Sequence, residues 1–119
     1  MPIYSQKSYT IAATTTHDNV VPWFPLDIFA DGFSVSFGIV LVAGGPINCR
    51  IVHTFDDVFN PTVTPVAFNH IDVTAAAGTN PGPVADGNYA FPVRAIKLVI
   101  TSAASAATFT YTVMQAAQA

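Results

Sequence analysis

Histidine and aspartate are the side chains of this sequence whose types and spacing could support chemistry, because glutamate is absent and there is one cysteine. His53 is followed by Asp56 and Asp57, and His70 is followed by Asp72. Two imidazoles and several carboxylates would meet if these segments were neighbours, and such a mixture suits a zinc ion. Against this, no two histidines stand at a short fixed spacing, and aspartates in turns commonly bond to nearby backbone. We therefore expect no metal, and an Asp/His metal hydrolase is kept only as a formal alternative.

Nucleophilic catalysis has even less support. Cys49 alternates with Ile47 and Ile51, the pattern of a small buried apolar residue rather than of a reactive thiolate. Ser36 does not lie in a Gly-x-Ser-x-Gly elbow. The glycines at 44 and 45 are not followed by the Lys-Ser/Thr pair of a phosphate-binding loop. The sequence predicts no catalytic residue, no cofactor and a non-enzymatic protein.

Charge is scarce throughout the chain. The 119 residues include 9% charged side chains, of which four are basic, against about 25% in a typical soluble domain. Four scattered basic residues cannot neutralise a nucleic-acid backbone, and no apolar run approaches the roughly 20 residues of a membrane span. We expect no nucleic-acid partner and no membrane partner. One cysteine and no visible signal peptide predict a soluble chain made in a reducing compartment.

The elements that must position these side chains are strands. Apolar residues recur with a period of two in segment after segment, which is the pattern of half-buried strands. The predicted strands span residues 9–15, 33–42, 47–55, 66–73, 93–101 and 108–115, with an extended, proline-interrupted edge segment at 20–26. We expect the Gly-Gly-Pro turn at 44–46 and the turn at 102–107 to close two hairpins, and residues 75–87 to form a loop.

The predicted fold is all-β: a single antiparallel β-sandwich or jelly-roll-like domain, essentially without helix, over residues 1–119. Residues 1–31 have the least regular pattern and are expected to be an extended arm or edge segment. Aromatic side chains in this stretch are candidate anchors of a protein interface, where such residues are enriched and charges depleted. The candidates are Tyr4, Trp23, Phe24 and Phe29. Aromatic residues outside the regular alternation could also stack on sugars, or could simply close the ends of the core.

Two segments resemble a known group. Residues 51–61, which contain His53-Thr54-Phe55-Asp56-Asp57, and residues 86–98, which contain Asp86-Gly87-Asn88-Tyr89, are similar to small β-rich virion-associated proteins of tailed bacteriophages. The resemblance covers roughly the C-terminal two-thirds of the chain, rests on strand-and-turn patterns, and transfers no catalytic residue.

The resemblance implies a structural protein of the virion, assembled in the cytoplasm of the bacterial host. We expect a capsid decoration or cement protein that forms homo-oligomers and binds the major capsid protein or another virion protein. The alternative is a tail-associated or carbohydrate- or receptor-binding module. Independently, Arg94 shares the predicted face of Ile96 and needs a carboxylate partner if it is partly buried, so we expect an ion pair with Asp56 or Asp57.

Overall fold

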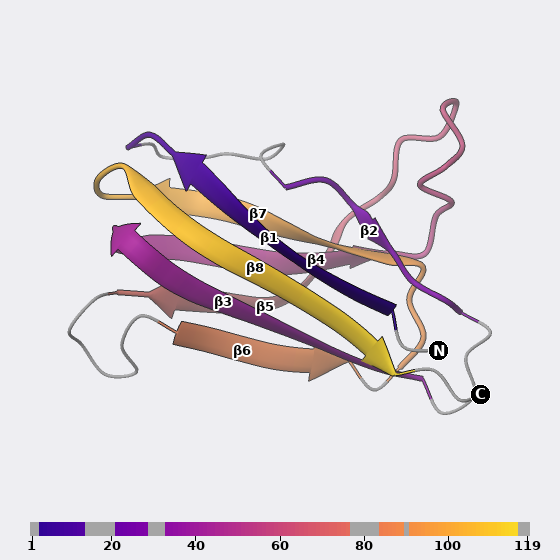
Figure 1. Ribbon diagram of the computed structural model, residues 1–119. Helices are drawn as coiled ribbons and strands as arrows, with labels where there is room; N and C mark the ends of the chain where they lie inside the picture. Colours follow the sequence, from indigo (N-terminus) through magenta and orange to yellow (C-terminus); the bar gives the residue numbers. More distant parts are fainter. Residues whose placement is uncertain (1–2, 14–20, 29–32, 77–83, 90, 117–119) are drawn as a thin grey trace.

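The fold consists of two four-stranded antiparallel sheets packed face to face (Figure 1). A computed structural model describes residues 3–13, 21–28, 33–76, 84–89 and 91–116, and this part of the chain contains no helix. The strands are β1 (Ile3–Ile11), β2 (Phe24–Pro25), β3 (Ser34–Gly44), β4 (Ile47–Thr54), β5 (Phe68–Ala75), β6 (Val84–Tyr89), β7 (Ala95–Ala103) and β8 (Ala107–Ala116). The predicted all-β sandwich is confirmed.

The strand order identifies the sandwich as a jelly roll. Sheet A has the order β1-β8-β3-β6 and sheet B has the order β2-β7-β4-β5. The first strand pairs with the last, the second with the seventh, the third with the sixth and the fourth with the fifth. This nesting is what results when a long folded-back chain is rolled into two layers.

Both predicted hairpins are wrong. The strands β3 and β4 belong to different sheets, and so do β7 and β8, so each short turn carries the chain from one layer to the other. Gly44 and Gly45 have φ values of +76° and +84°, and a Cβ on Gly44 would lie 1.9 Å from the Ala106 carbonyl oxygen. The two crossing turns contact each other, because the amide of Ala104 donates to the carbonyl of Pro46 (3.2 Å) and the Ser105 hydroxyl donates to that of Gly45 (2.9 Å). Glycine is needed at both positions because residues that carry a side chain rarely adopt such φ values.

Several predicted boundaries also move. The segment predicted as a loop at 75–87 contains most of β6, which pairs with β3. The first strand starts at Ile3 and ends at Ile11, earlier than the predicted 9–15, since its pairing with β8 begins at the rung Ile3–Gln115. The described parts of residues 1–31 include β1 and β2, and each forms an edge of its sheet.

The core lies between the inner faces of the sheets. The alternation seen in the sequence places Ile96, Leu98 and Ile100 of β7 fully inside, and the same holds for Ile47 and Ile51 of β4. Burying each such side chain stabilises the fold by about 1.5–3 kcal/mol. Phe109 of β8 and Tyr89 of β6 are the largest side chains that are fully enclosed.

The outer face of sheet A is nearly without charge. Most of its side chains are neutral, and between β1 and β8 three polar pairs bond across the strands: Gln6 to Thr112 (3.1 Å), Ser8 to Thr110 (3.1 Å) and Thr10 to Thr108 (3.2 Å). Tyr4 and Met114 form one exposed rung of this face. Among the described residues that alternate onto it, the charged one is Asp86.

Candidate functional site

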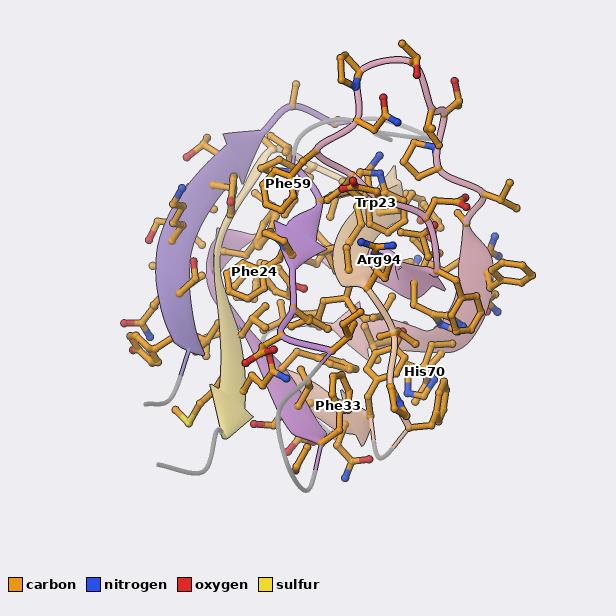
Figure 2. All side chains as sticks on the ribbon, turned by 90° about the vertical axis from the view of Figure 1, so that its right-hand side faces the viewer. Trp23, Phe24, Phe33, Phe59, His70 and Arg94 are labelled. Carbon is orange, nitrogen blue, oxygen red and sulfur yellow. The ribbon has the colours of Figure 1, made fainter. Side chains whose placement is uncertain are left out.

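Six aromatic and histidine rings gather at one end of the sandwich, where β4, β5 and β6 approach one another. Each of these strands contributes two rings spaced two residues apart, at its end or just beyond it, and contacts between the rings join the three pairs. We call this group the aromatic cluster; its members are His53, Phe55, Phe68, His70, Tyr89 and Phe91. Figure 2 looks at this end of the molecule and shows His70 on the side opposite Phe24 and Phe59.

His53 lies at the centre of the cluster. Its ring stacks on Phe68 with centroids 5.8 Å apart and meets Phe55, Tyr89 and Phe91 edge-on at 5.3–5.7 Å. Its Nδ1 lies 3.1 Å from the Tyr89 hydroxyl. Burial lowers the pKa of His53, and the neighbouring His70 lowers it further, because two imidazolium ions would repel. His53 is therefore neutral at pH 7.

His70 joins the edges of the two sheets. Its Nε2–H donates to the carbonyl oxygen of Asn88 in β6 at 2.7 Å, and its ring stacks on Tyr89 with centroids 3.8 Å apart. The pairing of β4 with β5 shifts here: Ile51 pairs with Ile71, but Val52 pairs with Asn69. His70 is the additional residue of this bulge, and bulges re-aim side chains in this way.

Three phenylalanines make the outer surface of the cluster. Phe55, Phe68 and Phe91 are 52%, 46% and 44% exposed, whereas His53 beneath them is buried. We call these three residues the phenylalanine patch. Large apolar side chains that remain together at the surface mark sites of contact with a partner. The patch is therefore the strongest candidate for a functional surface in the described part of the chain.

The histidines that the sequence placed near carboxylates do come together, with ring centroids 6.1 Å apart, but the carboxylates do not join them. Asp72 forms an ion pair with Arg50 at 3.0 Å on the outside of sheet B. Within the residues that the structure describes, no group of three or more His, Cys, Asp or Glu side chains could hold a metal ion. The environment of His53 and His70 is aromatic.

The expected ion pair of Arg94 is not formed with Asp56 or Asp57. The Asp56 carboxylate accepts from the Thr54 hydroxyl (3.4 Å) and the amide of Val66 (2.8 Å), and the Asp57 carboxylate accepts from the amide of Phe59 (2.9 Å). Both aspartates organise the loop that follows β4. Arg94 is exposed, so its guanidinium stays in water and does not require a carboxylate.

The four aromatic anchors expected near the N-terminus have different environments. Tyr4 is 56% exposed on the outer face of sheet A. Phe24 packs against the core from the edge strand β2, as a residue closing the sandwich does. Trp23 is half-buried, with the Lys97 ammonium 5.5 Å from its ring centroid. Phe29 lies outside the described residues.

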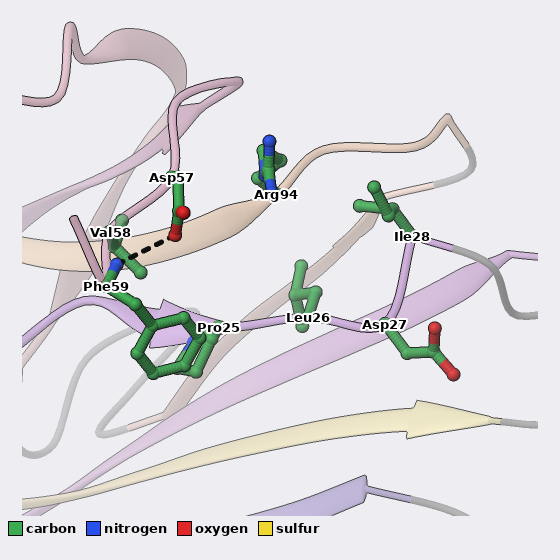
Figure 3. Close-up of a pocket in the computed structure, with 8 residues that line it drawn as sticks. All are labelled: Pro25, Leu26, Asp27, Ile28, Asp57, Val58, Phe59 and Arg94. Carbon is green, nitrogen blue, oxygen red and sulfur yellow. Dashed lines mark hydrogen bonds between the residues drawn. The ribbon is translucent and has the colours of Figure 1, made fainter.

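A small pocket lies at the same end of the sandwich as the aromatic cluster. Its volume is about 170 Å³. It lies between the chain that follows β2 and the loop that follows β4, and Figure 3 shows its lining residues. These are Pro25, Leu26, Asp27, Ile28, Asp57, Val58, Phe59 and Arg94.

Gln115 holds one wall of this pocket in place. The side chain is fully buried; its Oε1 accepts from the amide of Asp27 and its Nε2 donates to the carbonyl of Asp27, both at 2.8 Å. The amide of Leu26 also donates to the carbonyl of Arg94 at 2.8 Å. The wall is thus tied to both sheets.

Cys49 is buried on the inner face of β4, as its alternation predicts. Burial raises the pKa of its thiol to about 12. A thiol with that pKa is not a nucleophile near neutral pH.

The aromatic cluster was not predicted from the sequence, although a signal for it is present. His53-x-Phe55, Phe68-x-His70 and Tyr89-x-Phe91 each place two rings two residues apart at a predicted strand end or beside one. The aspartates stand closer to the histidines in sequence, but the rings are their neighbours in space.

The described part of the chain contains no helix that could span a membrane.

Comparison with known proteins adds little to these observations. No protein-family model matches the sequence, and no curated protein matches it. Among solved structures, one similar chain comes from work described as "Bacillus endospore appendages form a novel family of disulfide-linked pili". It is 18% identical, with 99% of this chain and 92% of that chain covered and a TM-score of 0.40.

Proposed function

We propose that this protein is a non-enzymatic structural protein of a bacteriophage virion, a decoration or cement protein that associates with itself and with the capsid surface. The observation that supports this most is the phenylalanine patch. Two further features agree with it: the nearly uncharged outer face of sheet A, and the jelly-roll fold, which viral capsid proteins and lectins share. The fold alone does not decide the function. The virion assignment rests on the resemblance of residues 51–61 and 86–98.

The patch is large enough to anchor a subunit contact. Three half-exposed phenylalanine rings leave roughly 300 Å² of apolar surface in water. Burying that surface would contribute about 7 kcal/mol before the costs of association are subtracted. Those costs are of similar size, so the patch would act as the centre of a larger interface rather than as the whole of it.

The self-association part of the proposal is tested by size-exclusion chromatography with light scattering over a range of protein concentrations. We expect the wild type to form an oligomer and Phe55→Ser/Phe68→Ser to shift it to a monomer that still folds, as checked by circular dichroism. Met114→Ser is the matched control, because Met114 is similarly exposed (44%) but lies on the outer face of sheet A, away from the patch. A wild type that is monomeric throughout, or a double variant that assembles as the wild type does, would contradict the role of the patch.

The virion part is tested by the genes on either side of the coding sequence. Neighbours that encode the major capsid, portal or tail proteins would support it, and genes without viral function would overturn it. If the patch mediates assembly but the neighbouring genes are not viral, the interface stands and the virion assignment falls.

A further inference from the structure

The pocket at the same end of the sandwich as the aromatic cluster is lined by residues that take no part in the proposed structural role. Figure 3 shows Asp57 and Phe59 on one side of it, Leu26 and Ile28 on the other, and Arg94 between them. At about 170 Å³ it is smaller than the roughly 300–1,000 Å³ of pockets that hold a drug-sized molecule. A ligand of this pocket would be a single ring or the end of a longer chain.

The guanidinium of Arg94 has hydrogen-bond donors that the described residues leave unused. Its guanidinium forms no ion pair or hydrogen bond with any described residue, whereas Arg50 is paired with Asp72. Asp57 lies across the same pocket, and the structure gives its Oδ1 a partner, the amide of Phe59 at 2.9 Å, which fixes the carboxylate. A guanidinium donates only and a carboxylate accepts only, so a ligand group that both donates and accepts can bond to both.

Phe59 is 76% exposed, the largest exposed fraction among the big apolar side chains of the described residues. Its ring lies next to Pro25, on the same side of the pocket as Asp57 (Figure 3). The face of an aromatic ring is electron-rich and attracts the slightly positive C–H groups of a ligand. Such a ring next to polar groups favours a ligand with one C–H face and an edge of hydroxyl groups.

The charges of the pocket restrict the ligand further. Figure 3 shows Arg94 and the Asp57 carboxylate above the pocket, whereas the Asp27 carboxylate points away from it. One charge of each sign disfavours both a simple anion and a simple cation. We propose that this pocket binds one neutral sugar ring, with Arg94 and Asp57 bonded to its hydroxyl groups and Phe59 against its C–H face.

The walls are formed before a ligand arrives. Gln115 bonds to the amide and the carbonyl of Asp27, and Leu26 is bonded to Arg94, so the segment 25–28 has little freedom to lose on binding. A preformed site lowers the entropic cost of binding. For a ligand the size of one hexose we expect a dissociation constant of about 1 mM.

The test is saturation-transfer-difference NMR on the full chain with glucose, galactose, mannose and N-acetylglucosamine, each up to about 20 mM. We expect at least one sugar to bind, and Arg94→Gln and Phe59→Ala each to weaken binding roughly tenfold or more. Arg50→Gln and Tyr4→Ala are the matched controls, since both side chains are exposed elsewhere, and they should leave binding unchanged.

Three results would overturn the proposal. One is the absence of signal from all four sugars. Another is sugar binding that neither Arg94→Gln nor Phe59→Ala weakens, which would place the site elsewhere. The third is that glycine or acetate, added as charged probes, binds more tightly than every sugar. None of these results bears on the oligomer test, which uses other residues.

Discussion

Gln115 is a fully buried amide whose two polar atoms both bond to the backbone of Asp27 at 2.8 Å. Replacing it with methionine, as Gln115→Met, keeps the length of the side chain and removes both hydrogen bonds. The amide and carbonyl of Asp27 then lose these two bonds to Gln115 at a site that is only part-buried.

The expected cost follows from these two bonds. Each contributes about 1 kcal/mol net, and each orphaned backbone group costs up to about 1 kcal/mol more where water reaches it incompletely. The free energy of unfolding should therefore fall by about 2–4 kcal/mol. For a chain of this size that corresponds to a melting temperature lower by about 8–16 °C.

Urea unfolding followed by circular dichroism measures the change, with Gln6→Met as the matched control. Gln6 donates one hydrogen bond, from Nε2 to the Thr112 hydroxyl, on the exposed face of sheet A, so this variant should cost less than about 0.5 kcal/mol.

Gln115→Glu gives a second readout. A protonated carboxyl both donates and accepts, so this variant should resemble the wild type near pH 4 and lose stability as rising pH ionises the buried carboxyl. If Gln115→Met stays within about 0.5 kcal/mol of the wild type, or if Gln115→Glu shows no such pH dependence, the two bonds do not stabilise the fold as inferred.

Four further outcomes are expected. Tyr111→Phe should raise the free energy of unfolding by about 1 kcal/mol in urea, because the Tyr111 hydroxyl is buried without a partner among the described residues; a clear loss would contradict this. The lowered pKa of His53 means that its contribution to stability is complete above about pH 6.5 and is lost as the pH falls towards the folded-state pKa; melting curves from pH 5 to 8 should show this loss in the wild type and less of it in His53→Gln. Gly87→Ala should cost about 1–3 kcal/mol, because its Cβ would lie 2.6 Å from the Phe37 ring, whereas Gly38→Ala, with nothing within 4 Å, should stay within about 0.5 kcal/mol in the same urea assay. Dialysis against a strong chelator should leave the melting temperature unchanged, and a fall of many degrees would revive a metal site at the two histidines.

The inner faces of the strands were predictable, but the partners of the strands were not. The alternation of apolar residues indicates which side chains are buried, and it correctly placed Ile96, Leu98 and Ile100 inside. It does not indicate which strands pair with each other. A short turn such as Gly44-Gly45-Pro46 connects strands of one sheet or crosses between two, and both outcomes bury the same residues.

The candidate site depended on that missing information. The ring pairs around His53 and His70 are visible in the sequence, but they meet only because β5 and β6 form the edges of different sheets on the same side of the sandwich. The predicted ion pair of Arg94 was wrong for a local reason. It precedes β7, which begins at Ala95, so the alternation that governs Ile96 does not extend to it.

The nested pairing of the strands has a consequence for the order in which the chain becomes ordered. The strands β4 and β5 are separated by one loop, whereas β1 and β8 come from opposite ends of the chain (Figure 1). Loop-closure entropy grows with separation, and folding slows when distant segments must meet. The pairs are therefore expected to close from the inside outwards, with β1 joining β8 last. Until β1 has paired, β8 has an open edge to which β1 of another copy could pair in the same register. Such an exchange of identical strands would connect subunits without any new interface.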